Sequence, residues 1–152
     1  MNAVTVRHAG DADLPYVLQD GYVSEDRVAR QIAAGEVWIA EVGSILRGYL
    51  RLEFLWGRVP FIALIRVRPE HRGRGTGRAL LSGAEQHVSA AGQPWLYSSS
   101  QADEPESQAW HRHMGFAECG FLAGVNAGGI GEVFFRKPIS HVLPAAAQPL
   151  RD

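Results

Sequence analysis

The sequence predicts an α+β fold in which a mixed, mostly antiparallel sheet of about seven strands is flanked by about four helices. Two observations lead to this expectation. Segments with the period of strands recur along the chain, and segments with apolar residues three and four positions apart lie among them. The length of 152 residues suits one domain with one core. We expect that domain over residues 1–139 and a flexible Pro- and Ala-rich tail over 140–152.

One strand and two short helices open the chain. Residues 3–9 alternate between apolar and polar side chains and are rich in β-branched types, which predicts a strand. Apolar residues at helical spacing then predict a helix that closes at Gly21. Ser24, followed by two acidic residues, is typical of the start of a second helix, which we expect to end at Gly35.

Three strands follow in succession, over about 36–42, 46–56 and 59–68. The connections between them are marked by Gly43 and Gly57 and are too short to hold a helix. Strands joined by such tight turns pair with their neighbours in antiparallel fashion. The sequence therefore predicts an antiparallel meander at this point.

Helices and strands alternate in the second half of the chain. One helix is predicted over about 76–91 and another over 105–114, which begins with a proline. Strands are predicted over 94–100, within 116–125 and within 131–139. Because a helix joins the last meander strand to the strand at 94–100, these two strands are expected to be parallel, which makes the sheet mixed.

Composition and charge exclude several classes of function. A net charge of −1 gives no overall attraction to nucleic acid, whose binding depends on neutralising phosphates. No apolar run is long enough to span a membrane, and the N-terminus has no signal-peptide pattern. The single cysteine, Cys119, can form neither an internal disulfide nor a thiolate cluster, and we expect it as a small buried side chain. We expect a cytoplasmic protein with no metal and no nucleic-acid or membrane partner.

Residues 66–81, RVRPEHRGRGTGRALL, concentrate positive charge between a predicted strand and a predicted helix. Free backbone N–H groups at a helix N-terminus bind anions, glycines let the backbone approach closely, and arginine binds phosphate in a bidentate manner. The segment does not fit the ATP-binding P-loop, because it has no lysine. Its glycines, at 73, 75 and 77, also do not match the dinucleotide fingerprint.

The segment instead contains R-x-x-G-x-G, from Arg72 to Gly77, and this resembles the acyl-CoA pyrophosphate loop of the GNAT superfamily of N-acyltransferases. WHRHMGF, residues 110–116, is similar to the aromatic-Tyr-x-x-Leu-Gly-Phe signature of the same family. The order of the predicted elements also agrees. The specific part of the resemblance covers about 60–116, and residues 1–59 agree only in pattern.

The resemblance implies a sheet splayed between its fourth and fifth strands, with the pantetheine arm of the cosubstrate acetyl-CoA lying in the gap like an added strand. Backbone groups of Ile65, Arg66 and Val67 are then expected to bind that arm. The pyrophosphate is expected at the loop and the first helical turn. The residues that the resemblance implies there are Arg72, Gly73, Arg74, Gly75, Thr76, Gly77 and Arg78.

Two residues are candidates for proton transfer. His111 stands where the family often has the tyrosine that protonates the departing thiolate, and an imidazolium can do the same. Some family members have a glutamate on the fourth strand as base; here Glu53, on the third strand, is the nearest carboxylate and can act through water. The alternatives are that His111 is a surface or packing residue and that Glu53 faces solvent or pairs with Arg51 or Arg58. His113 is expected on the surface.

The resemblance thus predicts an acetyl-CoA-dependent N-acetyltransferase that acetylates a primary amine of a small molecule or peptide, by direct attack in a ternary complex. The alternative is a non-catalytic module that binds acyl-CoA. The serines at 98–100 have two interpretations: they orient an amine or a water, or they are simply the polar end of a strand. The acidic residues at 103, 104 and 106 also have two: they attract a cationic amine, or they stabilise the start of the helix. For the oligomeric state, the sequence is compatible with a monomer and with a homodimer.

Overall fold

Residues 3–139, which the computed structural model describes, form seven strands in one sheet and four α-helices. Along the sheet the strands follow the order β1-β2-β3-β4-β5-β7-β6, and among the described strands only β4 and β5 are parallel neighbours. The predicted fold class and the predicted order of the elements are confirmed. The tail predicted over 140–152 lies outside the described residues.

The bounds agree best in the meander, where each strand begins and ends within one residue of its expected position. The helix expected to close at Gly21 is divided, because a four-residue α1 (Leu14–Val17) lies between 3-10 turns at Asp11–Asp13 and Leu18–Asp20. The strands are β1 (Thr5–His8), β2 (Val37–Val42), β3 (Ile45–Leu55), β4 (Val59–Val67), β5 (Trp95–Gln101), β6 (Ala117–Leu122) and β7 (Glu132–Pro138). The helices are α1 (Leu14–Val17), α2 (Glu25–Ala33), α3 (Thr76–Ala90) and α4 (Pro105–His113). None of these helices is both long and apolar enough to cross a bilayer.

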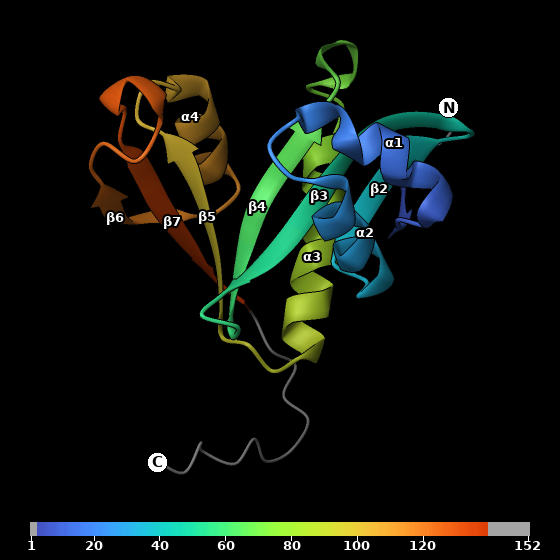
Figure 1. The fold of residues 1–152 in the computed structure, drawn as a ribbon, viewed down its shortest axis with the longest axis horizontal. Coiled ribbons are helices and arrows are strands. Elements are labelled where there is room, and N and C mark those ends of the chain that lie inside the picture. The colour runs from blue at the N-terminus through green and yellow to red at the C-terminus, as the bar shows by residue number, and fades with distance from the viewer. Residues whose placement is uncertain (1–2, 140–152) are drawn as a thin grey trace.

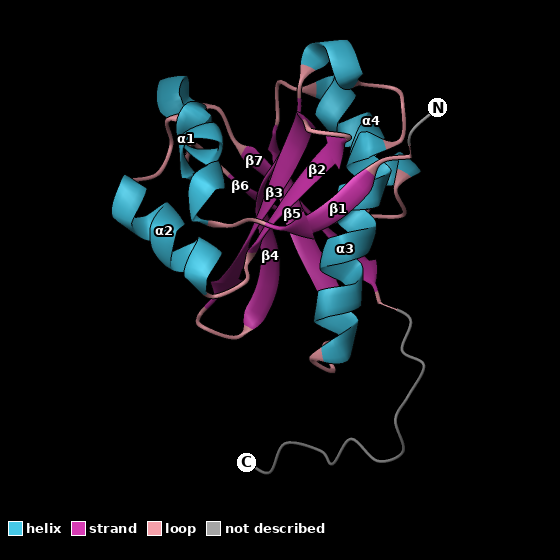
Figure 2. Cartoon of the chain, turned by 90° about the vertical axis from the view of Figure 1, so that its right-hand side faces the viewer, coloured by secondary structure: helices cyan, strands magenta, loops and turns pink. Residues whose placement is uncertain are grey.

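Helices cover both faces of the sheet (Figure 2). Each face has its own apolar core. On one face, α1 and α2 bury side chains such as Val17 and Val28 against β2 and β3. On the other face, α3 lies along β1 to β4 and buries a stripe of residues at helical spacing. That stripe consists of Leu80, Leu81, Ala84 and Val88.

The sheet opens where β4 should continue alongside β5. Among the described residues a single register pair, Phe61 with Tyr97, joins the two strands, and beyond it they diverge into a V (Figure 1). The pairing of β3 with β4 passes from Arg51–Leu64 to Leu52–Ile62, so Ala63 is an extra residue in β4. A bulge of this kind bends its strand and increases the local twist. The bend begins just beyond Phe61 and turns β4 away from β5.

Cys119 is exposed, so the prediction of a buried thiol is wrong. It lies in β6, the last strand of the sheet, all six residues of which are exposed. Between the pairs Glu118–Phe135 and Gly120–Phe134 it is also the extra residue of a bulge. The sequence pattern of β6 contains apolar residues but does not reveal that, within residues 3–139, neither a further strand nor a helix covers them.

Gly48 on β3 allows β4 to approach without a side chain between them. A Cβ at this position would lie 2.5 Å from the Arg66 carbonyl oxygen and 3.2 Å from the Val67 Cα. Gly48→Ala should therefore lower the free energy of unfolding by about 1–3 kcal/mol, because backbone atoms have to move. Chemical denaturation measures this, with Gly120→Ala as the control, since a Cβ there meets no atom within 4 Å. Equal stability of the two variants would contradict the prediction.

Candidate active site

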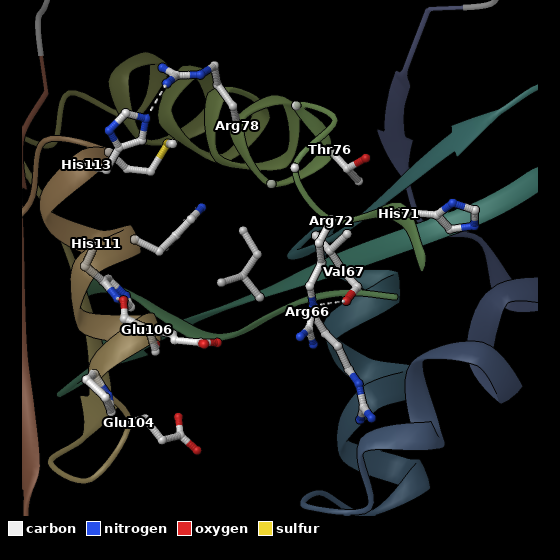
Figure 3. A pocket seen from close by; sticks show the side chains of 18 residues that line it. Arg66, Val67, His71, Arg72, Thr76, Arg78, Glu104, Glu106, His111 and His113 are labelled. Atoms are coloured by element: carbon white, nitrogen blue, oxygen red, sulfur yellow. Dashed lines mark hydrogen bonds between the residues drawn. The ribbon is translucent and has the colours of Figure 1, made fainter. Parts of the chain in front are cut away.

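A cleft of about 980 Å³ lies between the two halves of the sheet, with β4 and α3 on one side and α4 on the other (Figure 3). The structure brings ten of the twelve predicted site residues into its lining, and leaves out Arg74 and Glu53. The ten are Ile65, Arg66, Val67, Arg72, Gly73, Gly75, Thr76, Gly77, Arg78 and His111. Residues from three separate segments of the chain therefore meet at one place.

The β4 wall of the cleft is a strand edge that β5 does not cover. Beyond Phe61 the edge that faces β5 has no partner strand among the described residues, so backbone groups of Ile65 to Val67 are available to an extended ligand. One of them is already engaged, because Arg72 Nε donates to the Val67 carbonyl at 3.1 Å. This bond ties the arginine- and glycine-rich loop to the end of β4.

The start of α3 has the geometry of an anion site. Gly73 and Gly75 have φ of +71° and +82°, a region that favours glycine, and they turn the chain into the helix. The Ala79 amide donates to the Gly75 carbonyl at 3.0 Å, so the three preceding helical amides have no partner within the helix. The Thr76 hydroxyl is buried and has no hydrogen-bond partner among the described residues. These donors suit phosphate oxygens.

The α4 wall contains residues that the sequence did not single out for binding. Trp110 packs so close to Gly77 that a Cβ there would lie 3.4 Å from the indole ring. His113 is exposed, as predicted, yet it lines the cleft and its Nε2 lies 3.5 Å from Arg78 Nη2. Glu104 also lines the cleft. Helical spacing places His113 on another side from His111, and only the packing of α3 against α4 shows that both border one cavity.

His111 is 2% exposed and both of its ring nitrogens are hydrogen bonded. Nδ1 lies 2.7 Å from the Ser107 carbonyl oxygen, which can only accept, so Nδ1 carries the hydrogen. Nε2 lies 2.8 Å from Ser98 Oγ and, in the neutral ring, accepts from that hydroxyl. The ring also stacks on Phe135 with centroids 4.7 Å apart. One tautomer and one ring orientation are thereby selected.

Burial lowers the pKa of His111 from its ordinary value, while the Ser107 carbonyl and the charge of Glu132 act in the opposite direction. The ring is therefore mainly neutral near pH 7. A neutral ring with its hydrogen on Nδ1 has no proton on the nitrogen that faces Ser98. The predicted role as an imidazolium acid thus requires His111 first to gain a proton.

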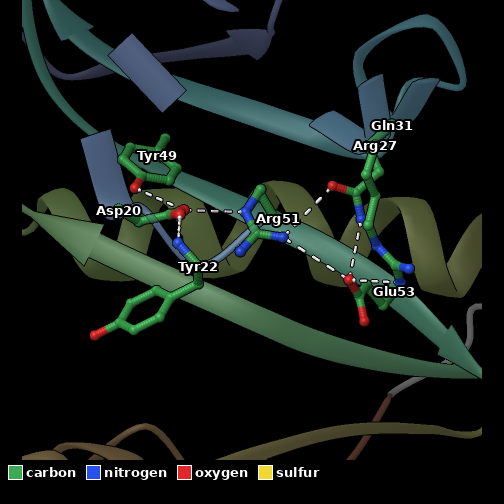
Figure 4. A network of polar contacts seen from close by, with 7 residues as sticks. All are labelled: Asp20, Tyr22, Arg27, Gln31, Tyr49, Arg51 and Glu53. Atoms are coloured by element: carbon green, nitrogen blue, oxygen red, sulfur yellow. Dashed lines mark hydrogen bonds and ion pairs between the residues drawn. The ribbon is translucent and has the colours of Figure 1, made fainter. Parts of the chain in front are cut away.

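Glu53 belongs to a polar network on the opposite face of the sheet, beneath α1 and α2 (Figure 4). Its Oε1 accepts from Arg27 at 3.0 Å and from Gln31 at 3.3 Å, and lies 3.8 Å from Arg51 Nη1. Arg51 is 2% exposed and its Nε lies 3.3 Å from the buried carboxylate of Asp20. The pairing of Glu53 with Arg51, one of the two alternatives, is present in the structure, and Arg27 is an additional partner.

No metal-binding set is apparent within residues 3–139, where no three His, Cys, Asp or Glu side chains are grouped as ligands. What the described cleft does offer is a helix N-terminus with free amides beside an open strand edge. This combination defines a class of protein that holds an extended, phosphate-bearing ligand between two halves of a sheet.

Comparison with known proteins agrees with that class. A sequence model of the acetyltransferase (GNAT) family matches residues 5–116, and the chain belongs to this family. No curated protein matches the sequence. Among solved structures, Ard1 from Thermoplasma volcanium is similar with a TM-score of 0.81 and 15% identity, covering 91% of this chain and 99% of that one.

Two other solved structures are also similar to this chain. The ribosomal-protein-alanine N-acetyltransferase from Brucella melitensis is 25% identical with a TM-score of 0.73, covering 88% of this chain and 99% of that one. The protein yncA from Salmonella typhimurium, solved with its cofactor acetyl-CoA, is 21% identical with a TM-score of 0.76, covering 96% of this chain and all of the other. The resemblance drawn from the two motifs is confirmed at the level of the family.

The lowered pKa of His111 predicts a pH dependence of stability. In the unfolded chain the imidazole regains an ordinary pKa near 6.5 and binds the proton more readily than in the folded protein. The free energy of unfolding should therefore decrease as the pH falls below about 6.5, until the pKa of the folded state is passed, by at most about 1.4 kcal/mol per pH unit. In His111→Gln this contribution should be missing.

Thermal unfolding between about pH 7.5 and 5.5 measures this slope. His87, whose pKa is also lowered by burial, is present in both proteins and cancels in the comparison. His113→Gln removes an exposed imidazole from the same helix and serves as the control. Parallel curves for the wild-type protein and His111→Gln would show that His111 does not titrate differently on folding.

Proposed function

We propose that this protein is an N-acetyltransferase that transfers the acetyl group of acetyl-CoA to a primary amine of a small molecule or peptide. The observation that carries the proposal is the convergence of the α3 N-terminus and the open β4 edge in one cleft. The pyrophosphate is assigned to the amides and the hydroxyl at Thr76 to Arg78, and the pantetheine arm to the backbone of Ile65 to Val67. Arg72, held against Val67, borders both.

In this proposal the amine attacks the thioester directly within a ternary complex. Holding the two reactants together supplies most of the acceleration, and a backbone N–H of β4 polarises the thioester carbonyl. His111, which lines the cleft, transfers protons there. A base role for Glu53 requires a chain of water, because its carboxylate lies outside the cleft and already pairs with Arg27.

The alternative of a non-catalytic module that binds acyl-CoA has a specific observation in its favour. Both nitrogens of His111 are engaged in hydrogen bonds, and Glu53 is engaged in ion pairs. Both proposals share the cleft and differ only in whether an amine is consumed. Composition supports, for either, a cytoplasmic protein without a membrane or nucleic-acid partner.

The first experiment measures release of free thiol from acetyl-CoA by the purified protein with a panel of amines: short peptides, polyamines and aromatic amines. We expect release that depends on the amine, and a fall in rate on the order of 100-fold or more in His111→Phe with CoA binding retained in calorimetry. Glu53→Gln tests the second candidate in the same assay. Tight CoA binding without release would favour the binding module, and absence of CoA binding would overturn both proposals.

Binding of CoA should depend on the left-handed turn at Gly75. Gly75→Trp places a large side chain at the mouth of the anion site and strains a backbone with φ of +82°, so we expect calorimetry to detect no binding of CoA. Gly92→Trp is the matched control, because Gly92 has φ of +75° just beyond the other end of α3 and does not line the cleft. If both variants bind CoA equally well, the loop is not the phosphate site.

A further inference from the structure

Arg78 and His113 are two basic side chains that point toward one another where α3 and α4 meet (Figure 3). Arg78 belongs to the first turn of α3, and His113 is the last residue of α4. Both are exposed and both line the cleft, and Arg78 Nη2 lies 3.5 Å from His113 Nε2. Guanidinium and imidazole are both groups that bind phosphate oxygens.

No acidic residue neutralises this pair. Within residues 3–139, no carboxylate forms an ion pair with Arg78 or with His113. The neighbouring arginine of α4 differs, because Arg112 Nη2 lies 4.0 Å from Glu118 Oε1. The contact of 3.5 Å between Arg78 and His113 is also long for a hydrogen bond, so it satisfies the two groups only in part. The pair therefore keeps donors for an anion that enters the cleft.

The packing of α4 on α3 brings the two basic groups together. Gly77 lets Trp110 approach the first turn of α3 so closely that a Cβ at 77 would lie 3.4 Å from the indole ring. Arg78 directly follows Gly77. His113 lies three positions after Trp110, and residues at this spacing are neighbours on a helix surface. The pair is thus held beside the backbone amides that begin α3.

CoA carries one phosphate for which the site described so far has no partner. The amides of the first turn and the Thr76 hydroxyl are assigned to the pyrophosphate, and the β4 edge to the pantetheine arm. The 3′-phosphate is attached to the ribose, which is joined to the pyrophosphate at the end opposite to the arm. It must therefore lie close to the start of α3, on the side away from β4. Phosphate monoesters carry a charge of about −1.5 to −2 at pH 7.

We propose that Arg78 and His113 form a subsite for the 3′-phosphate of CoA and make the protein select CoA over dephospho-CoA. The subsite rests on the proposed binding of acetyl-CoA and adds to it two side chains and a preference among nucleotides. A guanidinium and an imidazolium can donate to the same phosphate, and such charge-assisted hydrogen bonds are stronger than neutral ones. The pair lies on the α3 and α4 side of the cleft, as the order of the groups along CoA requires (Figure 3).

The test compares the Kd of CoA with that of 3′-dephospho-CoA, measured by calorimetry on the wild-type protein, Arg78→Gln, His113→Gln and the double variant. We expect the wild-type protein to bind CoA more tightly than dephospho-CoA, by a factor on the order of 10 or more. Each single substitution should reduce this ratio, and the double variant should bind both nucleotides equally. The Kd of dephospho-CoA should be nearly the same in all four proteins, because every variant keeps the backbone amides of α3.

Arg112→Gln is the matched control, because it removes a positive charge next to His113 from a side chain that does not line the cleft. It should keep the wild-type preference for CoA. Equal affinities in the wild-type protein, or a preference that survives in the double variant, would overturn the subsite and leave the acetyltransferase intact. Equal losses for both nucleotides in the variants would also overturn it, since the pair would then serve the pyrophosphate. A wild-type protein that binds neither nucleotide would overturn the proposed function and the subsite together.

Discussion

The separation of β4 from β5 is the constraint on which the rest of this structure depends. The strands share one register pair, Phe61 with Tyr97, and the extra residue Ala63 bends β4 away just beyond it. A parallel sheet that closed here would pair the backbone of Ile65 to Val67 and leave no cleft. The backbone groups released by this local irregularity are the ones that an extended ligand needs.

The loop before α3 completes the cleft because of how it is anchored. Arg72 Nε donates to the Val67 carbonyl, which connects the loop to the bent end of β4. Glycine at 75 allows the left-handed turn into the helix, and glycine at 77 allows Trp110 to approach the first turn. The same small residues thus serve the turn, the contact between α3 and α4, and the exposure of helical amides to the cleft.

Buried polar groups on the two faces of the sheet have different consequences. Beneath α1 and α2, Asp20 and Arg51 neutralise one another, and breaking such a buried pair costs about 3–5 kcal/mol, so this network fixes the helices on the sheet. On the α4 face, the hydrogen bonds that the structure gives the His111 ring are to uncharged groups, the Ser98 hydroxyl and the Ser107 carbonyl. The polar contacts of the first face are thus between opposite charges, and those of His111 are hydrogen bonds of a neutral ring.

The amino-acid sequence was enough to predict the fold class, the order of the elements, the strand bounds of the meander and the glycine-rich loop before α3, because period, turn residues and glycine spacing are local properties. Two motifs also determined the family. Only the arrangement in space shows that Ala63 bulges, that Cys119 is exposed on the last strand of the described sheet, and that Glu53 lies across the sheet from His111. It alone paired Ser98 with His111 and set the protonation of that ring. These features depend on which segments meet in space, and side-chain partners contributed by distant elements leave no pattern in the local sequence.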